Sequence, residues 1–167
     1  RQFSIAETQR VIDITRQLKE FFPKTKNPLI VANIGGFTMD EPLPCGERKA
    51  LYEIFADSLS HLDMAGVELI PQTMAPFPWH FGGQRFQNLF IDPDEIAEWC
   101  SVLNLRMCFD ISHSKLACNH YSWDFEKFVA TVAPFTAHLH VGDASGVNGE
   151  GLQIGEGDVD FDATSEM

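Results

Sequence analysis

Hydrophobic positions follow two different periods along the chain. Apolar residues recur at helical spacing in residues 4–21, 47–61, 92–103 and 123–132, which predicts four amphipathic helices. Short apolar runs without that period lie between them, at 29–34, 67–70, 105–109 and 137–141, and such runs suit parallel strands buried on both faces. The regular alternation of helix and strand predicts an α/β fold with a parallel sheet and right-handed crossovers.

Capping signals support these helix boundaries. Ser4 followed by Glu7 predicts a capping box at the start of the first helix. Asp92 before Pro93 predicts an N-cap followed by the proline that the first helical turn tolerates, and Pro134 prevents continuation of the fourth helix. The first helix is expected to bury one apolar face made of Val11, Ile14, Leu18 and Phe21.

A polar residue ends each predicted strand. Asn33, Gln72, Asp110 and His140 occupy these positions. They lie about 30 to 40 residues apart, close to the size of one βα unit. Parallel strands bring their carboxyl ends to one edge of the sheet, where α/β proteins build their sites. Asp110 with His113, and His138 with His140 on one face of a strand, are therefore candidates for a divalent-cation site. Each motif alone is weak, because a histidine at a strand end is often a hydrogen-bonded core residue.

Two long loops follow predicted strands. The loop at 71–90 is rich in proline and glycine, and the loop at 143–160 is rich in glycine without a regular pattern. Loops of this length in compact domains are usually functional or disordered. Trp79 and His80 are candidates to cover a bound ligand, and packing within the loop explains them equally well. Lys115 and Arg85 are the basic groups nearest the predicted site, where an anionic group of a ligand would need a cation.

Composition narrows the class of protein. The chain has 167 residues, 44% of them apolar and 22% charged, with a net charge of −12. This charge argues against nucleic-acid partners, which require basic surfaces. No apolar run approaches the roughly 20 residues that span a membrane, so we expect no membrane partner. The four cysteines form no CxxC pair, which favours reduced thiols and a cytoplasmic location.

Three stretches carry a family resemblance: "FDISH" at 109–113, "HLHVGDASG" at 138–146 and "IGEGDVDF" at 154–161. With them, residues 29–161 resemble the sugar phosphate isomerase/epimerase superfamily, the xylose-isomerase-like TIM barrels that include the endonuclease IV type. "PFPWHFGGQ" at 76–84 is also similar to isomerase-like barrels joined to N-acetylneuraminate synthase-like enzymes. The resemblance implies a (β/α)₈ barrel, which needs roughly 200 residues or more. We therefore expect residues 1–167 to form a single incomplete TIM-barrel domain, a fragment with about four βα units. Whether the protein is a homo-oligomer or carries a fused domain is left open by the sequence.

The resemblance also implies a divalent metal ion at the carboxyl ends of the strands, held by a glutamate, an aspartate, a histidine and a second glutamate. Asp110 and His140 match the aspartate and the histidine, and His113 would contact substrate oxygens. The first glutamate falls on Gln72, a departure from the pattern, because an amide oxygen ligates weakly and cannot accept a proton at neutral pH. The second glutamate belongs to a strand beyond this chain, for which Glu156 is an alternative.

The expected site therefore has three parts. Its metal ligands are Asp110, His140 and Gln72, its catalytic residues are His113 and Gln72, and its substrate contacts are His113, Trp79, His80 and Lys115. Asp143 is expected to orient His140 as a hydrogen-bond acceptor. The metal is manganese, cobalt, magnesium or zinc, since all four accept mixed oxygen and imidazole ligands.

Two functions follow. The first is a metal-dependent isomerase or epimerase of a sugar or sugar phosphate that works through an enediolate. The second is a catalytically degenerate barrel that binds a sugar or metal as a module of a larger biosynthetic protein, and Gln72 favours it. A zinc DNA-repair endonuclease of the same superfamily is disfavoured by the net charge of −12.

Overall fold

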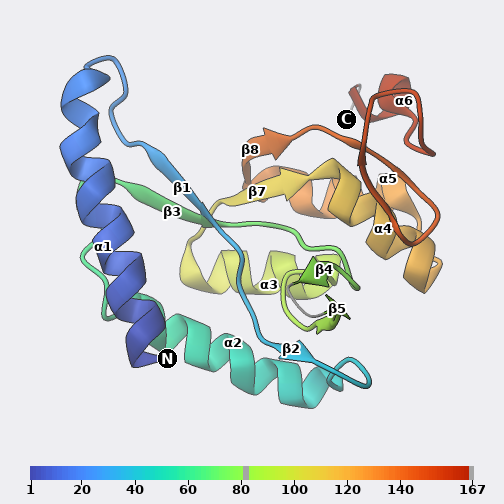
Figure 1. The fold of residues 1–167 in the computed structure, drawn as a ribbon, viewed down its shortest axis with the longest axis horizontal. Coiled ribbons are helices and arrows are strands. Elements are labelled where there is room, and N and C mark those ends of the chain that lie inside the picture. Colours follow the sequence, from blue (N-terminus) through green and yellow to red (C-terminus); the bar gives the residue numbers. More distant parts are fainter. Residues whose placement is uncertain (81–82, 166–167) are drawn as a thin grey trace.

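The structure is a computed structural model that describes residues 1–80 and 83–165. Its helices are α1 (Gln2–Leu18), α2 (Cys45–Leu59), α3 (Pro93–Leu103), α4 (Ile111–Tyr121), α5 (Phe125–Val132) and α6 (Phe161–Ser165) (Figure 1). The longer strands are β1 (Leu29–Ala32), β3 (Glu68–Pro71), β7 (Met107–Asp110), β8 (Thr136–His140), β9 (Asp143–Ser145) and β10 (Gly149–Leu152). Two-residue strands are β2 (Phe37–Thr38), β4 (Trp79–His80), β5 (Gly83–Gln84) and β6 (Phe86–Gln87). No described helix is both long and apolar enough to cross a membrane.

Four parallel strands form the centre of the molecule, in the order β1-β3-β7-β8. β1 pairs with β3, and β7 pairs with β8 so that Asp110 lies opposite His140. The residues after β3 join the two pairs, because the Gln72 backbone N–H donates to Ala32 and the Thr73 N–H donates to the Cys108 carbonyl at 3.1 Å. This arrangement confirms the predicted α/β class, a partial TIM barrel with parallel strands.

The four strands differ in burial. β7 is buried along its whole length, and in β3 every residue after Glu68 is buried, as the sequence predicts. The prediction of burial on both faces is wrong for β1 and β8, where Leu29 is 36% and Leu139 is 51% exposed. In the described sheet β1 pairs only with β3, and β8 pairs only with β7. Each outer strand therefore has one side without a strand neighbour.

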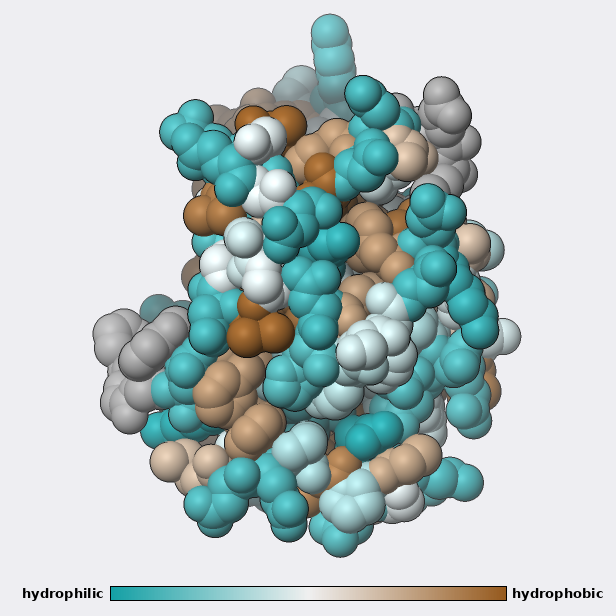
Figure 2. Space-filling model, turned by 90° about the vertical axis from the view of Figure 1, so that its right-hand side faces the viewer, coloured by the Kyte–Doolittle hydropathy of each residue, from teal (hydrophilic) through white to brown (hydrophobic). Residues whose placement is uncertain are grey.

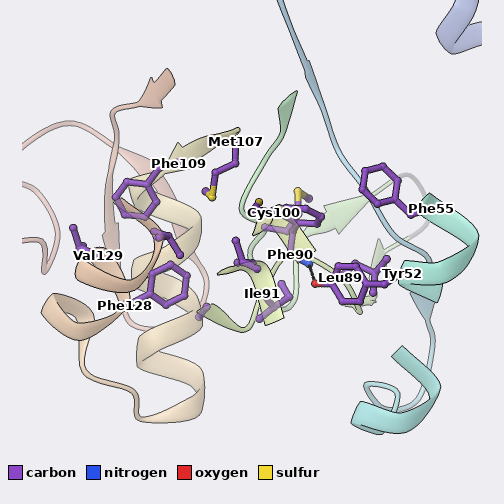
Figure 3. Close-up of a cluster of buried hydrophobic side chains, with 14 of the residues drawn as sticks. Tyr52, Phe55, Leu89, Phe90, Ile91, Cys100, Met107, Phe109, Phe128 and Val129 are labelled. Atoms are coloured by element: carbon purple, nitrogen blue, oxygen red, sulfur yellow. Dashed lines mark hydrogen bonds between the residues drawn. The ribbon is translucent and has the colours of Figure 1, made fainter. Parts of the chain in front are cut away.

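One continuous hydrophobic core packs against the strands (Figure 3). Tyr52 and Phe55 from α2 lie at one end of it, and Phe109 and Phe128 lie at the other, with ring centroids 6.2 Å apart. The Tyr52 hydroxyl accepts the backbone N–H of Phe90 at 3.0 Å. Phe90 is fully buried and has a positive φ of 59°, so this bond secures a strained backbone position inside the core.

The first helix differs from its prediction. α1 begins at Gln2 and has no side-chain cap, so the capping box expected from Ser4 and Glu7 is wrong. Its buried residue is Ile12, whereas all four residues of the predicted face are exposed, Phe21 by 69%. Polar bonds hold the inner side of the helix, including one from Arg16 Nε to the Ala65 carbonyl at 2.8 Å. The apolar stripe therefore points away from the core.

A helix that the sequence analysis missed follows β7 directly. The predicted third strand ends at Asp110, as β7 does, but no helix was expected directly after it, whereas α4 begins at the next residue. The Asp110 carboxylate accepts the backbone N–H of His113 at 3.0 Å, as an N-cap does. Most residues of α4 are buried, including Ser112 and Ser114, so no apolar period marks this helix in the sequence.

The glycine-rich segment after β8 also has regular structure. It forms the antiparallel hairpin of β9 and β10, in place of the irregular loop expected for residues 143–160. The Ser112 hydroxyl in α4 accepts the Gly151 N–H at 2.8 Å, and Asn119 Nδ2 donates to the Gly146 carbonyl at 2.7 Å. These bonds hold the hairpin against α4, at the same edge of the sheet as the strand ends.

Candidate functional site

Polar side chains from three neighbouring strands meet at the carboxyl edge of the sheet. Gln72 Nε2 donates to Asp110 Oδ2 at 3.2 Å, and His140 Nδ1 lies 3.4 Å from the same oxygen. Asp110 is buried at 8% exposure, because it lies between two strands and under the first turn of α4. The structure thus brings together three of the four residues that the sequence placed at the ends of successive strands, while the fourth, Asn33, lines a different cavity.

His113 enters this cluster from the first turn of α4. Its Nδ1 lies 2.9 Å from the Thr73 carbonyl oxygen, which only accepts, so we assign a hydrogen to Nδ1. Its Nε2 lies 3.0 Å from Glu150 Oε1. Burial alone would lower the pKa of His113, but the hydrogen bond to Glu150 and the charge of Asp110 outweigh it, so the pKa is raised above its usual value.

Thr73 and Ser114 fix the backbone beneath the cluster, and sequence reasoning missed both. The Thr73 hydroxyl is fully buried and accepts the Asp110 N–H at 2.9 Å. The Ser114 hydroxyl donates to the Asp110 carbonyl at 2.8 Å. The only sequence signal for Thr73 is its place directly after Gln72, at the end of a predicted strand. These bonds orient Asp110 before any ligand arrives.

A cavity of about 210 Å³ opens beside the cluster. It is lined by Asp110, Ser112, His113, His140, Val141, Gly142, Glu150, Gly151 and Leu152. Glu150 is a residue that the sequence analysis did not single out, and it reaches the cavity from β10. A larger cavity of about 390 Å³ lies between α1, β1 and α2, but its lining is mainly apolar and carries no carboxylate or imidazole. The smaller cavity is therefore the candidate site.

Asp143 has a different place from the one expected. It is fully buried, and its two carboxylate oxygens accept four backbone N–H groups, at distances of 2.8 to 3.1 Å, from Ala144, Gly155, Gly157 and Val159. A Cβ on Gly157 would lie 2.3 Å from the Ala144 carbonyl oxygen, so this approach needs glycine. Burial raises the pKa of the Asp143 carboxyl, but the four donors outweigh it and lower the pKa below its usual value. Asp143 therefore organises the loop and does not orient His140.

Several other expected residues lie away from the cavity. Lys115 Nζ is 5.4 Å from the Phe125 ring centroid and does not line the cavity, so the structure gives no support to its predicted substrate contact. Glu156 is exposed in the turn after β10, also outside the lining. Trp79 and His80 form β4, but their side chains lie outside the described part of the structure.

The side chains of this cluster supply some, but not all, of the ligands that a divalent cation needs. Asp110 and His140 are strong ligands whose nearest atoms are 3.4 Å apart, a separation that adjacent ligands of one cation can have. Gln72 directs its amide nitrogen, which cannot ligate, toward Asp110. Within residues 1–80 and 83–165, no three His, Cys, Asp or Glu side chains are grouped to hold a metal. Further ligands would have to come from outside these residues, from water or from a substrate.

Comparison with known proteins agrees with this architecture. A D-tagatose 3-epimerase-like protein aligns with a TM-score of 0.59 and 23% identity, over 83% of this chain and 50% of that protein. A xylose isomerase domain protein from Planctomyces limnophilus aligns with a TM-score of 0.65 and 18% identity, over 99% of this chain and 54% of that one. The 3-keto-D-glucoside 4-epimerase from E. coli aligns with a TM-score of 0.52 and 15% identity, over 83% of this chain and 49% of that protein.

The chain thus spans about half the length of these solved structures, and at such identities the likeness concerns the fold. No curated protein matches the chain. A family model described as xylose isomerase-like TIM barrel matches residues 1–167, the whole chain. This match shows that the chain belongs to the xylose isomerase-like TIM barrel family, and the parallel strand pairs β1-β3 and β7-β8, joined at Gln72 and Cys108, agree with it.

Proposed function

We propose that the chain is part of a sugar or sugar-phosphate isomerase or epimerase, and that the cavity at the ends of β7 and β8 binds the sugar. The observation that carries the proposal is the lining of this cavity. Asp110, His113 and His140 supply charged and imidazole groups, and Glu150 adds a second carboxylate, all within one 210 Å³ space. Such a set of donors and acceptors suits the adjacent oxygens of a polyol. The solved relatives named above as epimerases support the same class.

A divalent cation, one of manganese, cobalt, magnesium and zinc, is part of this proposal. Asp110 and His140 would hold it, and Gln72 would contribute only after turning its amide oxygen inward. When bound there, such a cation polarises the carbonyl and hydroxyl oxygens of a sugar and stabilises negative charge on them.

The residues of this chain have separate tasks in the proposed reaction. Isomerisation or epimerisation through an enediolate requires removal of a proton from the carbon beside the carbonyl group and its return. Gln72 cannot accept that proton, because an amide is not a base at neutral pH. His113, which the Thr73 carbonyl holds in one orientation, directs Nε2 to the cavity side and toward Glu150. The chain therefore positions a sugar with Asp110, His113 and His140 and needs a carboxylate other than position 72.

A second candidate function is sugar or metal binding without turnover, as a module of a larger protein. The contact from Gln72 Nε2 to Asp110 favours it, because this hydrogen bond uses the carboxylate oxygen that also faces His140. Gln72→Glu in the intact protein separates the two candidates. A gain of sugar conversion in this variant would show that the scaffold is poised for chemistry, whereas no gain would support binding without turnover.

The proposed function is tested with the intact protein by elemental analysis and by calorimetric titration with Mn²⁺, Co²⁺, Mg²⁺ and Zn²⁺, followed by a screen of ketoses and ketose phosphates for conversion. The test variant is D110A/H140A. The matched control is E98A/H120A, which removes an exposed carboxylate and an exposed imidazole that do not line the cavity. We expect stoichiometric cation and sugar conversion in the wild type and the control, with both lost in the test variant. A wild type that converts none of the sugars would overturn the catalytic proposal.

A further inference from the structure

Glu150 occupies a defined place in the cavity wall. Its Oε1 lies 3.0 Å from His113 Nε2, and its side chain is 42% exposed, so it reaches both the imidazole and the space where a ligand would bind. The hairpin that carries it is fixed on two sides. Gly151 donates its N–H to Ser112 at 2.8 Å, and Asn148 accepts from Gln84 Nε2 at 3.0 Å. The position of Glu150 therefore follows from the fold and not from one flexible side chain.

The hydrogen-bond pattern around His113 leaves one mobile hydrogen between the side chains of His113 and Glu150. The Thr73 carbonyl oxygen takes the hydrogen on Nδ1, which leaves Nε2 as the nitrogen that faces Glu150. An imidazole nitrogen and a carboxylate oxygen 3.0 Å apart form a hydrogen bond only when one hydrogen lies between them. The pair thus holds one hydrogen that either partner can carry, which is what a proton-transfer group requires.

Other carboxylates of the described chain do not offer this combination. Asp110 already accepts from Gln72 and from the His113 backbone. Asp143 is fully buried and accepts four backbone N–H groups. Glu68 lies at the other end of β3 from Gln72 and pairs with Arg106. Of the two carboxylates that line the cavity, Glu150 lies 3.0 Å from an imidazole nitrogen, whereas Asp110 lies 3.4 Å from His140 Nδ1 and 3.5 Å from His113 Nδ1.

We propose that Glu150 is the general base of this site, in place of the carboxylate that is absent at Gln72, and that His113 is its proton-transfer partner. The proposal rests on the proposed function and takes a ketose or ketose phosphate as substrate. A Glu150 oxygen accepts the proton from the carbon beside the carbonyl group, and the C–H electron pair becomes the carbon–carbon double bond of an enediol. The carbonyl π pair moves to oxygen, which receives the hydrogen from His113 Nε2. Glu150 then delivers its proton to the former carbonyl carbon, and the hydroxyl on the neighbouring carbon loses its hydrogen to His113 Nε2 as its oxygen becomes the new carbonyl, so both side chains regain their starting state.

The experiment measures exchange of the substrate carbon-bound hydrogen with deuterated water. The intact protein is incubated with D-fructose, D-tagatose, D-allulose and their 6-phosphates, and deuterium in the recovered sugar is determined by mass spectrometry. The variants are E150Q, which keeps the size and removes the base, E150D, which keeps a carboxylate, and E98Q, an exposed control on α3. Circular dichroism and calorimetric sugar binding verify that each variant is folded.

We expect E150Q to lower kcat about 100-fold or more with a change in KM below about threefold, since general base catalysis contributes roughly 10²–10⁴ in rate. E150D should keep a measurable part of the activity, a rescue that loss of a merely structural contact would not show, and E98Q should match the wild type. Wild-type exchange that E150Q retains within about twofold would overturn the role of Glu150 and leave the proposed function intact. A wild type that exchanges no sugar would overturn the proposed function and the role of Glu150 together. If E150Q does not fold, E150D decides: activity indistinguishable from an equally shortened, uncharged E150N variant would overturn the inference.

Discussion

The two inner strands of the sheet and its two outer strands have similar sequences but different environments. Phe109 on β7 and Leu139 on β8 are partners in the parallel register, yet Phe109 is 4% exposed and Leu139 is 51% exposed. Figure 2 faces the side of the molecule that carries α4, α5 and α6, and it shows hydrophobic patches between hydrophilic side chains. An open apolar cavity of about 440 Å³, lined by both residues of this pair, lies at β8. Apolar sequence thus predicts a strand, while burial depends on how many neighbours the strand has.

The two faces of α1 also differ in burial, although both carry apolar residues. Ile12 is completely buried, whereas the predicted stripe with Ile14 and Leu18 is exposed. In a closed barrel every strand has two strand neighbours and every helix covers them from outside. The chain spans about half the length of its solved relatives. Leu29 on β1, Leu139 on β8 and the predicted stripe of α1 are exposed apolar positions on the outer elements of the described structure.

The largest effect should come from the matched pair on β7 and β8. Phe109→Ala removes a buried ring that stacks on Phe128 and should cost about 3–5 kcal/mol of unfolding free energy. Leu139→Ala should cost less than about 0.5 kcal/mol in residues 1–167, because its side chain already contacts water. Urea unfolding of both variants measures the difference. Equal losses would show that β8 is as buried in solution as β7.

A smaller contrast is expected within α1. Ile12→Ala should lower the free energy of unfolding by about 2–4 kcal/mol, because it leaves a cavity under the helix. Ile14→Ala, two positions along on the exposed side, should change it by less than about 0.5 kcal/mol. Thermal unfolding of the two variants side by side tests which face packs. A larger loss for Ile14 would restore the orientation that the hydrophobic pattern predicts.

The smallest effect is expected in the segment 143–160. The carboxylate of Asp143, and not an apolar core, holds this segment in place. Asp143→Asn replaces one oxygen with an NH₂ group that faces backbone donors, and should cost about 1–3 kcal/mol. Amide hydrogen exchange at Gly155 and Gly157 should accelerate, while exchange at Phe109 stays slow. Unchanged exchange at both glycines would contradict the organising role of Asp143.

The same carboxylate predicts a dependence on pH. Because folding lowers the pKa of Asp143, its contribution is fully present above the pKa of the unfolded chain and is lost as pH falls through the folded value. The difference in stability between wild type and D143N should therefore shrink below about pH 4. Urea unfolding at a series of pH values measures it. A difference that grows as the pH falls would contradict the direction of this shift.

The strand order and the meeting of Gln72, Asp110 and His140 follow from the sequence, because polar residues at the ends of parallel strands share one edge of the sheet. α4 does not follow, since a helix with buried serines has no hydrophobic period. The place of Glu150 does not follow either. It depends on the turn of the β9–β10 hairpin and on the N–H groups of Gly155, Gly157 and Val159, which Asp143 binds although they are distant in sequence.

β7 leads directly into α4, and this junction limits where residues can be inserted into the chain or deleted from it. Asp110 is both the last residue of the strand and the N-cap of the helix, so no connecting residue exists that could be lengthened without moving the carboxylate. Insertions are tolerated in exposed connections and not at such a junction. We therefore expect members of this family to differ by insertions and deletions in residues 73–92 and 141–160, and to keep the spacing of Asp110 and His113 unchanged.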